Sequence, residues 1–136
     1  MFKIKTLRVD DEYDMQIRVS LIAEFCSCSL DFYIGGNEEF KTFAEELKDF
    51  PFRGKKEIEF VYGEDNSRWA HYLKIGVNLI DGSGRSVIKV IMDNKGEVDE
   101  NYRCEFPINT DVHTLNRLGQ KLSEWKPIEG EIWSFE

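Results

Sequence analysis

The segment FCSCSLDFYI contains Cys26 and Cys28, two thiols separated by a single residue. This spacing can chelate a metal ion or form a redox couple. Residues of one parity in a β-strand face the same side of the sheet. The two cysteines have the same parity as the apolar residues Leu30, Phe32 and Ile34. We therefore predict that both thiols are small core residues of a strand.

The other potential metal ligands do not complete a site with these cysteines. A structural zinc site needs four ligands, and Cys104, His71 and His113 have no familiar ligand spacing. Cys104 and His71 lie on apolar strand parities, where burial raises the pKa of a thiol. His113 falls in the first turn of a predicted helix, which disfavours its cationic form. We predict no metal ion, no cofactor and no catalytic residue.

The glycine and carboxylate patterns also lack the signs of an enzyme. GGN follows a strand without the further glycine and lysine of a phosphate loop, and DGSG lies between two strands. Both segments are typical of turns. Glu57 and Glu59 lie opposite an apolar strand parity, which indicates a solvated face. A zinc or thiol enzyme is the third alternative, after two kinds of binding protein.

Length and charge limit the classes of partner. The chain has 136 residues, which is the usual size of one domain, and a formal net charge of −8. Such a surface repels nucleic acid and anionic lipid and attracts basic proteins. No apolar run approaches the roughly 18 residues of a membrane helix, and three cysteines cannot all pair within one chain. We expect one domain (1–136), cytoplasmic, with reduced thiols, no nucleic acid and no membrane.

Period-two alternation of apolar residues predicts most of the secondary structure. The predicted strands cover residues 2–9, 13–21, 26–34, 58–62, 69–79, 87–92 and 102–108. Helical spacing follows Asn37, a good helix cap, and ends before Pro51. A second helix is capped by Thr110 or Asp111 and ends before Pro127, and the apolar tail predicts a short final strand. The predicted class is α+β: a largely antiparallel sheet of about seven strands with two helices packed on one face.

Acidic residues gather in the predicted turns, where they could form an electronegative patch that attracts a basic partner. The candidate acidic contacts are Asp10, Asp11, Glu12, Glu64, Asp65, Glu97, Asp99 and Glu100. Tyrosines are frequent anchors of protein interfaces. The candidate aromatic contacts are Tyr33, Tyr62 and Tyr72.

Three phrases and the order of elements resemble a known family. The phrases are FxxFAxxL (40–47), DGxGxSxIxV (81–90) and LGxxLxxW (118–125). They resemble bacterial immunity proteins of polymorphic toxin systems, particularly the WapI family. The resemblance implies a non-enzymatic cytoplasmic protein that binds and blocks a cognate toxin domain, often a basic nuclease. No catalytic or binding residue transfers from it.

These observations predict an intracellular protein that occludes a cognate toxin domain. The alternative is a module that binds a small ligand or a peptide on a concave antiparallel sheet. A pocket closed by Trp69, Trp125 and Trp133 would favour this alternative, whereas a flat acidic face would favour the protein binder.

Overall fold

The computed structural model describes residues 1–11, 14–51, 53–66 and 70–136. Alternating apolar residues form the strands, and in β2 each buried residue is followed by a more exposed one. The strands are β1 (Phe2–Asp11), β2 (Asp14–Ile22), β3 (Ser27–Ile34), β4 (Glu57–Tyr62), β5 (Tyr72–Leu79), β6 (Arg85–Asp93), β7 (Arg103–Asp111) and β8 (Ile132–Phe135). The helices are α1 (Lys41–Lys48), preceded by the 3-10 turn Asn37–Phe40, and α2 (Val112–Ser123).

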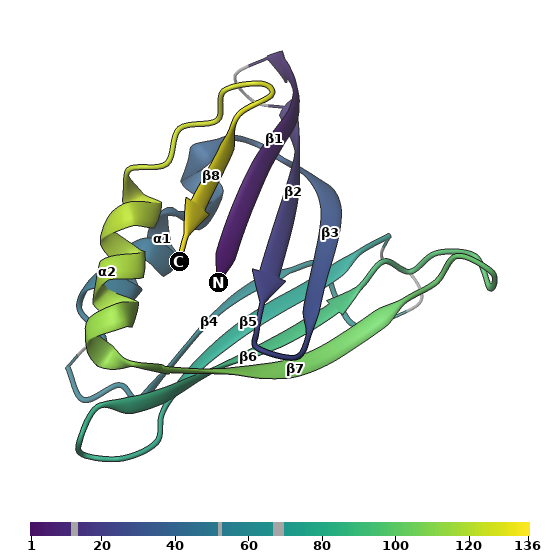
Figure 1. Cartoon of the computed structure of the whole chain (residues 1–136). Coiled ribbons are helices and arrows are strands. Elements are labelled where there is room, and N and C mark those ends of the chain that lie inside the picture. The colour runs from purple at the N-terminus through teal and green to yellow at the C-terminus, as the bar shows by residue number, and fades with distance from the viewer. Residues whose placement is uncertain (12–13, 52, 67–69) are drawn as a thin grey trace.

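The strands form two antiparallel sheets, so the predicted α+β class is confirmed. Sheet 1 has the order β3-β2-β1-β8, and sheet 2 has the order β4-β5-β6-β7. The arrangement differs from the expected sheet of about seven strands, because the segment with α1 separates β3 from β4 and the last strand returns to pair with β1. Figure 1 shows the two sheets crossing at a steep angle.

The crossing angle follows from which residues of β3 touch sheet 2. The ring of Phe32 lies 4.3 Å from that of Tyr62 in β4, while the thiol of Cys28 is hydrogen-bonded to that of Cys104 in β7. Four residues of a strand span about 13 Å, and three strand spacings span about 14 Å. β3 therefore runs across all four strands of sheet 2, which is orthogonal packing.

The two helices lie at the open side between the sheets, rather than on one face of a single sheet (Figure 1). Phe40 stacks on Phe60 of β4 at 4.7 Å and meets the edge of Trp125 at 5.7 Å. The amide of Asn116 in α2 donates to the carbonyls of Leu47 and Phe50 at the end of α1. The helices thus join both sheets into one apolar core.

The two predicted helix caps have different outcomes. Asp111 caps α2 as predicted, because its carboxylate accepts a 2.7 Å hydrogen bond from the Thr114 N–H. Asn37 makes no side-chain cap hydrogen bond, since it is already the first residue of the 3-10 turn that Gly36 precedes. The chain therefore enters α1 only at Lys41.

The cysteines divide between core and surface. Cys28 is buried on β3 as predicted, and Cys104 is half-buried on β7. The prediction for Cys26 was wrong, because this residue is exposed. β3 begins only at Ser27, and the Ala23 N–H donates to the Cys26 carbonyl at 2.7 Å, so Cys26 lies in the turn between β2 and β3.

Candidate functional site

Two acidic loops converge at one end of sheet 2. β4 and β6 run in the same direction, so the loops that follow them leave the sheet at the same end. We call this surface the acidic end; it consists of Glu64, Asp65, Glu97, Asp99 and Glu100. Five of the eight acidic residues predicted from the sequence therefore come together.

An ion-pair network ties the two loops of the acidic end. Arg103 on β7 donates to both carboxylate oxygens of Asp65, at 2.8 and 3.0 Å, and also reaches Asp93 at 3.2 Å. Lys95 donates to Asp65 at 3.1 Å, and its backbone N–H donates to Asp93. Burial acts to raise the pKa of Asp93, but the Lys95 and Arg103 hydrogen bonds hold this pKa below its usual value. The network fixes the β4–β5 loop against β7.

The network predicts an acid-dependent contribution of Asp65 to stability. Hydrogen bonds from Arg103 and then Lys95 lower the pKa of Asp65 to about 2. The ordinary value is 3.8, so the carboxylate stabilises the fold above about pH 4, and this contribution disappears as the pH falls toward 2. We expect the difference in urea midpoint between the wild type and Asp65→Asn to shrink across this range. Asp99→Asn removes one carboxylate of the acidic end that takes no part in this network, so it is the control for the loss of charge. The same change with pH in both variants would contradict the prediction.

The acidic end remains strongly negative despite its ion pairs. Its described residues, together with Asp93 and Glu105, supply seven carboxylates against the two cations Lys95 and Arg103. Val98 lies between Glu97 and Asp99 with its side chain 100% exposed. An apolar side chain within a negative rim suits a protein partner better than a small ligand.

The remaining predicted acidic residues belong to a different part of the molecule. Asp10 lies at the end of β1 in sheet 1, where Arg8 donates to its carboxylate at 2.6 Å. Asp11 follows it, and Figure 1 shows this end of sheet 1 apart from the β6–β7 loop. Glu12 lies outside the described residues. The structure therefore does not bring Asp10 and Asp11 into the acidic end.

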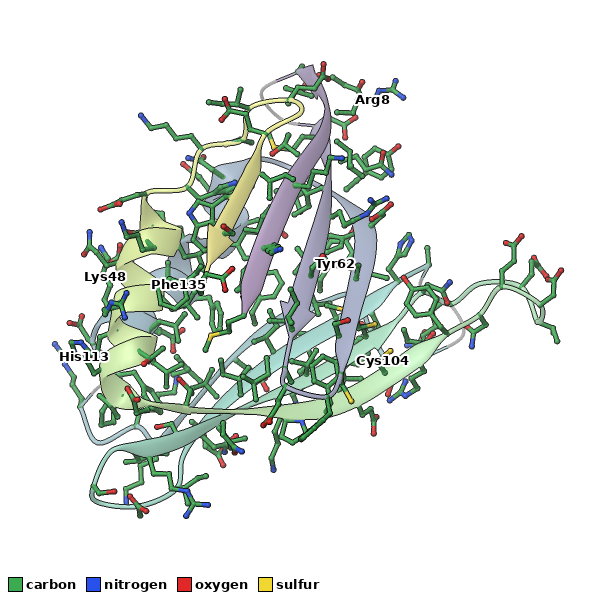
Figure 2. The ribbon with its side chains drawn as sticks, viewed as in Figure 1. Arg8, Lys48, Tyr62, Cys104, His113 and Phe135 are labelled. Atoms are coloured by element: carbon green, nitrogen blue, oxygen red, sulfur yellow. The ribbon has the colours of Figure 1, made fainter. Side chains whose placement is uncertain are left out.

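The three predicted aromatic contacts differ in exposure. Tyr62 packs with its ring tilted against Phe32 between the sheets, where Figure 2 labels it near β3, and burial raises its pKa. Tyr72 is 9% exposed. Tyr33 is 47% exposed on the outer face of sheet 1. Of the three, Tyr33 alone presents a large part of its ring to a partner.

A groove that the sequence did not indicate runs beside β3. Its volume is about 330 Å³, and it is lined by Arg18, Ser29, Leu30, Asp31, His71, Asn94 and Tyr102. The Arg18 guanidinium binds both oxygens of Asp31, at 2.7 and 3.0 Å. His71, predicted as a core residue, is half-buried here, and burial lowers its pKa so that its neutral form is favoured. The groove ends at Asn94, whose side chain donates to the Glu100 carbonyl of the acidic end.

The thiols have no arrangement typical of a nucleophile. Burial, then the Cys104 thiol, raises the pKa of Cys28 to about 12, so this thiol stays protonated. Figure 2 shows Cys104 beneath β3. Within the described ranges, no group of three or more histidine, cysteine or acidic side chains could hold a metal ion. No described helix is both long and apolar enough to cross a membrane.

The proposed tryptophan pocket is formed only in part. Trp125 and Trp133 line a common cavity of about 250 Å³, whereas Trp69 lies outside the described residues. Trp125 is 4% exposed because its ring packs on Phe40 in the core. The outer face of sheet 2 holds a hollow of about 650 Å³ over Gly76, but charged side chains such as Glu59 and Lys74 line it.

Comparison of the chain with protein-family models, with curated proteins and with solved structures finds no match in any of the three.

Proposed function

We propose that this protein is a non-enzymatic binding protein that occludes a basic toxin domain, as an immunity protein does. The observation that carries the proposal is the convergence of Glu64, Asp65 and the 97–100 loop at one end of sheet 2, around the exposed Val98. Together with the sequence resemblance, this arrangement favours a protein partner with a positive surface.

The mechanism is electrostatic capture followed by occlusion. A cluster of carboxylates raises the rate at which a positive protein arrives, by a factor of about 10 to 1,000 at low salt. Charged groups lose their hydration when they are buried, so they contribute more to the association rate than to the affinity. We expect the exposed side chain of Val98 and the exposed ring of Tyr33 to stabilise the complex once it has formed. Blocking the toxin then needs no catalytic group.

The first experiment is capture of partners on the tagged protein from extracts of its native cells, with elution along a salt gradient. We expect a basic toxin domain to elute as the salt screens the charges. Failure to retain any protein in cells that express a toxin would contradict the proposal.

The captured domain then allows a kinetic prediction. We expect the triple variant Glu97→Gln, Asp99→Asn, Glu100→Gln to associate with it about tenfold more slowly at low salt, with little change near 1 M salt. The control carries Glu57→Gln, Glu59→Gln and Glu136→Gln, which remove equal charge outside the acidic end. Stopped-flow association rates compare the two, and equal slowing in both variants would show that only net charge matters.

A module that binds a small ligand is the second candidate, because Trp125 and Trp133 line one cavity. Its volume of about 250 Å³ is below the usual range of ligand sites, about 300 to 1,000 Å³. This size and the burial of Trp125 in the core favour the protein binder.

A further inference from the structure

β3 is an edge strand, and the direction of its main-chain groups can be assigned. In sheet 1, β3 pairs only with β2. The Ala23 N–H donates to the Cys26 carbonyl, so Cys26 and every second residue after it direct their main-chain groups toward β2. The intervening residues direct theirs away from the sheet, and they are Ser27, Ser29, Asp31 and Tyr33. The 2.6 Å hydrogen bond from the Tyr102 hydroxyl to the Ser29 carbonyl agrees with this assignment.

Two of these residues leave main-chain groups unpaired. Within the described part of the chain, the N–H and C=O groups of Asp31 and Tyr33 make no hydrogen bond. They lie about 6.5 to 7 Å apart, which is the repeat that a neighbouring strand presents. Because main-chain groups are strong donors and acceptors, this edge can accept another strand.

β7 is the edge strand of sheet 2 next to the β2–β3 turn, and a proline protects it against strand addition. The Val112 N–H donates to the Gly84 carbonyl, so the even residues of β7 face β6 and the odd residues point outward. Pro107 is one of the outward residues and has no N–H to offer. β3 contains no proline between Ser27 and Ile34. Pro107 therefore hinders strand addition along β7, whereas no proline does so along β3.

The groove beside β3 indicates the charge of an added strand. Arg18 and Asp31 neutralise each other through their bidentate pair. Asn94 donates to the Glu100 carbonyl, so the groove adjoins the acidic end. Among the described residues, the Glu97 and Glu100 carboxylates have no ion-pair partner there. A strand lying along β3 would direct every second side chain toward this negative surface, which favours cations at those positions.

We propose that an extended basic segment of the partner adds to the free edge of β3 as a further strand. Its main chain pairs with the N–H and C=O groups of Asp31 and Tyr33, and its lysine or arginine side chains reach the acidic end. This inference rests on the proposed function, since it names the part of the partner that is bound.

The test uses a short synthetic peptide of alternating lysine and threonine, with a matched peptide of the same sequence N-methylated at every residue. We expect the first peptide to slow hydrogen exchange at the Asp31 and Tyr33 amides about tenfold, measured by NMR, and to leave the Ser27 amide unchanged. The N-methylated peptide has equal charge but lacks donors, so it should bind about tenfold more weakly. Equal binding of both peptides would overturn strand addition.

Two variants of Tyr33 separate the contribution of its main-chain N–H to peptide binding from that of its side chain. Tyr33→Pro removes the outward N–H without touching the bonds to β2, and Tyr33→Ala removes only the ring. We expect Tyr33→Pro to bind the lysine–threonine peptide about tenfold more weakly than Tyr33→Ala, and Ser27→Pro to bind as the wild type. Equal affinities of the two Tyr33 variants would overturn the proposal. If Tyr33→Pro does not fold, the exchange measurement on the wild type decides.

The outcomes distinguish this inference from the proposed function. A captured toxin domain that binds both Tyr33 variants equally would leave the proposed function standing and refute the edge pairing. Protection of the Asp31 and Tyr33 amides by the peptide, with no basic protein captured, would do the reverse. Concentration-dependent protection of these amides in the protein alone would show that a second copy covers the edge, which also overturns the inference.

Discussion

Gly119→Ala is expected to destabilise the fold by about 3 kcal/mol, because α1 and α2 touch at this residue. An alanine Cβ would lie 2.5 Å from the Lys48 backbone nitrogen and 2.7 Å from the Ala44 carbonyl oxygen. Both neighbours are backbone atoms of α1, so the helices must move apart. Alanine gains about 1 kcal/mol of helix propensity over glycine, which is too little to offset this clash. Urea unfolding followed by circular dichroism measures the change.

Gly82→Ala is the matched control. A Cβ at Gly82 meets no atom within 4 Å, and its backbone does not have the positive φ of Gly84. We expect the unfolding free energy of Gly82→Ala to stay within about 0.5 kcal/mol of the wild type. A Gly119→Ala variant as stable as Gly82→Ala would mean that the helices do not meet at this distance.

Phe40→Ala is expected to cost about 3 to 5 kcal/mol of unfolding free energy. Phe40 is 1% exposed and joins three parts of the core: α1 begins next to it, Phe60 stacks on it from sheet 2, and Trp125 meets it from the end of α2. Its loss removes buried apolar area and leaves a cavity between rigid neighbours. Small domains have only about 5 to 15 kcal/mol of stability in total, so this variant should unfold at much lower urea.

The same substitution at Phe25 provides the comparison for Phe40. Phe25 is 89% exposed, so Phe25→Ala should change the unfolding free energy by less than about 0.5 kcal/mol. If Phe40→Ala cost less than about 1 kcal/mol, the ring could not be the junction between the helices and sheet 2.

The strands could be predicted because their apolar residues alternate, but their division into two sheets could not. Alternation fixes which residues of β3 face inward, and Leu30 and Phe32 do so. It says nothing about which strands pair. The pairing of β1 with β8, with Phe2 opposite Phe135, depends on the path of the intervening chain. The crossing of β3 over sheet 2 depends on the shapes of both faces.

The boundary of β3 shows a second limit of the sequence pattern. Cys26 continues the apolar parity of Cys28, yet hydrogen bonding between Ala23 and Cys26 places it in a turn. Parity persists for a residue or two beyond the end of a strand, so it does not mark where burial stops. Strand and helix boundaries are therefore less certain than the elements themselves.

Part of the candidate site could also be predicted from the sequence. Acidic turns were visible, and two successive hairpins must place alternate loops at one end of their sheet, so Glu64 and Glu97 belong together. The bond between Asp65 and Arg103 was not predictable, because these residues are 38 positions apart and have ordinary exposed side chains. The groove beside β3 combines Asp31 with His71 and Tyr102, which come from different sheets and connections.

Sheet 1 pairs β1 with β8, which are far apart in the sequence, whereas sheet 2 is built from the four successive strands β4 to β7. During synthesis, the partners of every strand in sheet 2 emerge one after another. β1 must wait for β8, and at 5 to 20 residues per second the interval between Lys5 and its partner Ile132 is about 6 to 25 s. For that time the ring of Phe2 has neither Trp133 nor Phe135 beside it, so the nascent chain carries an unfinished sheet until β8 is made.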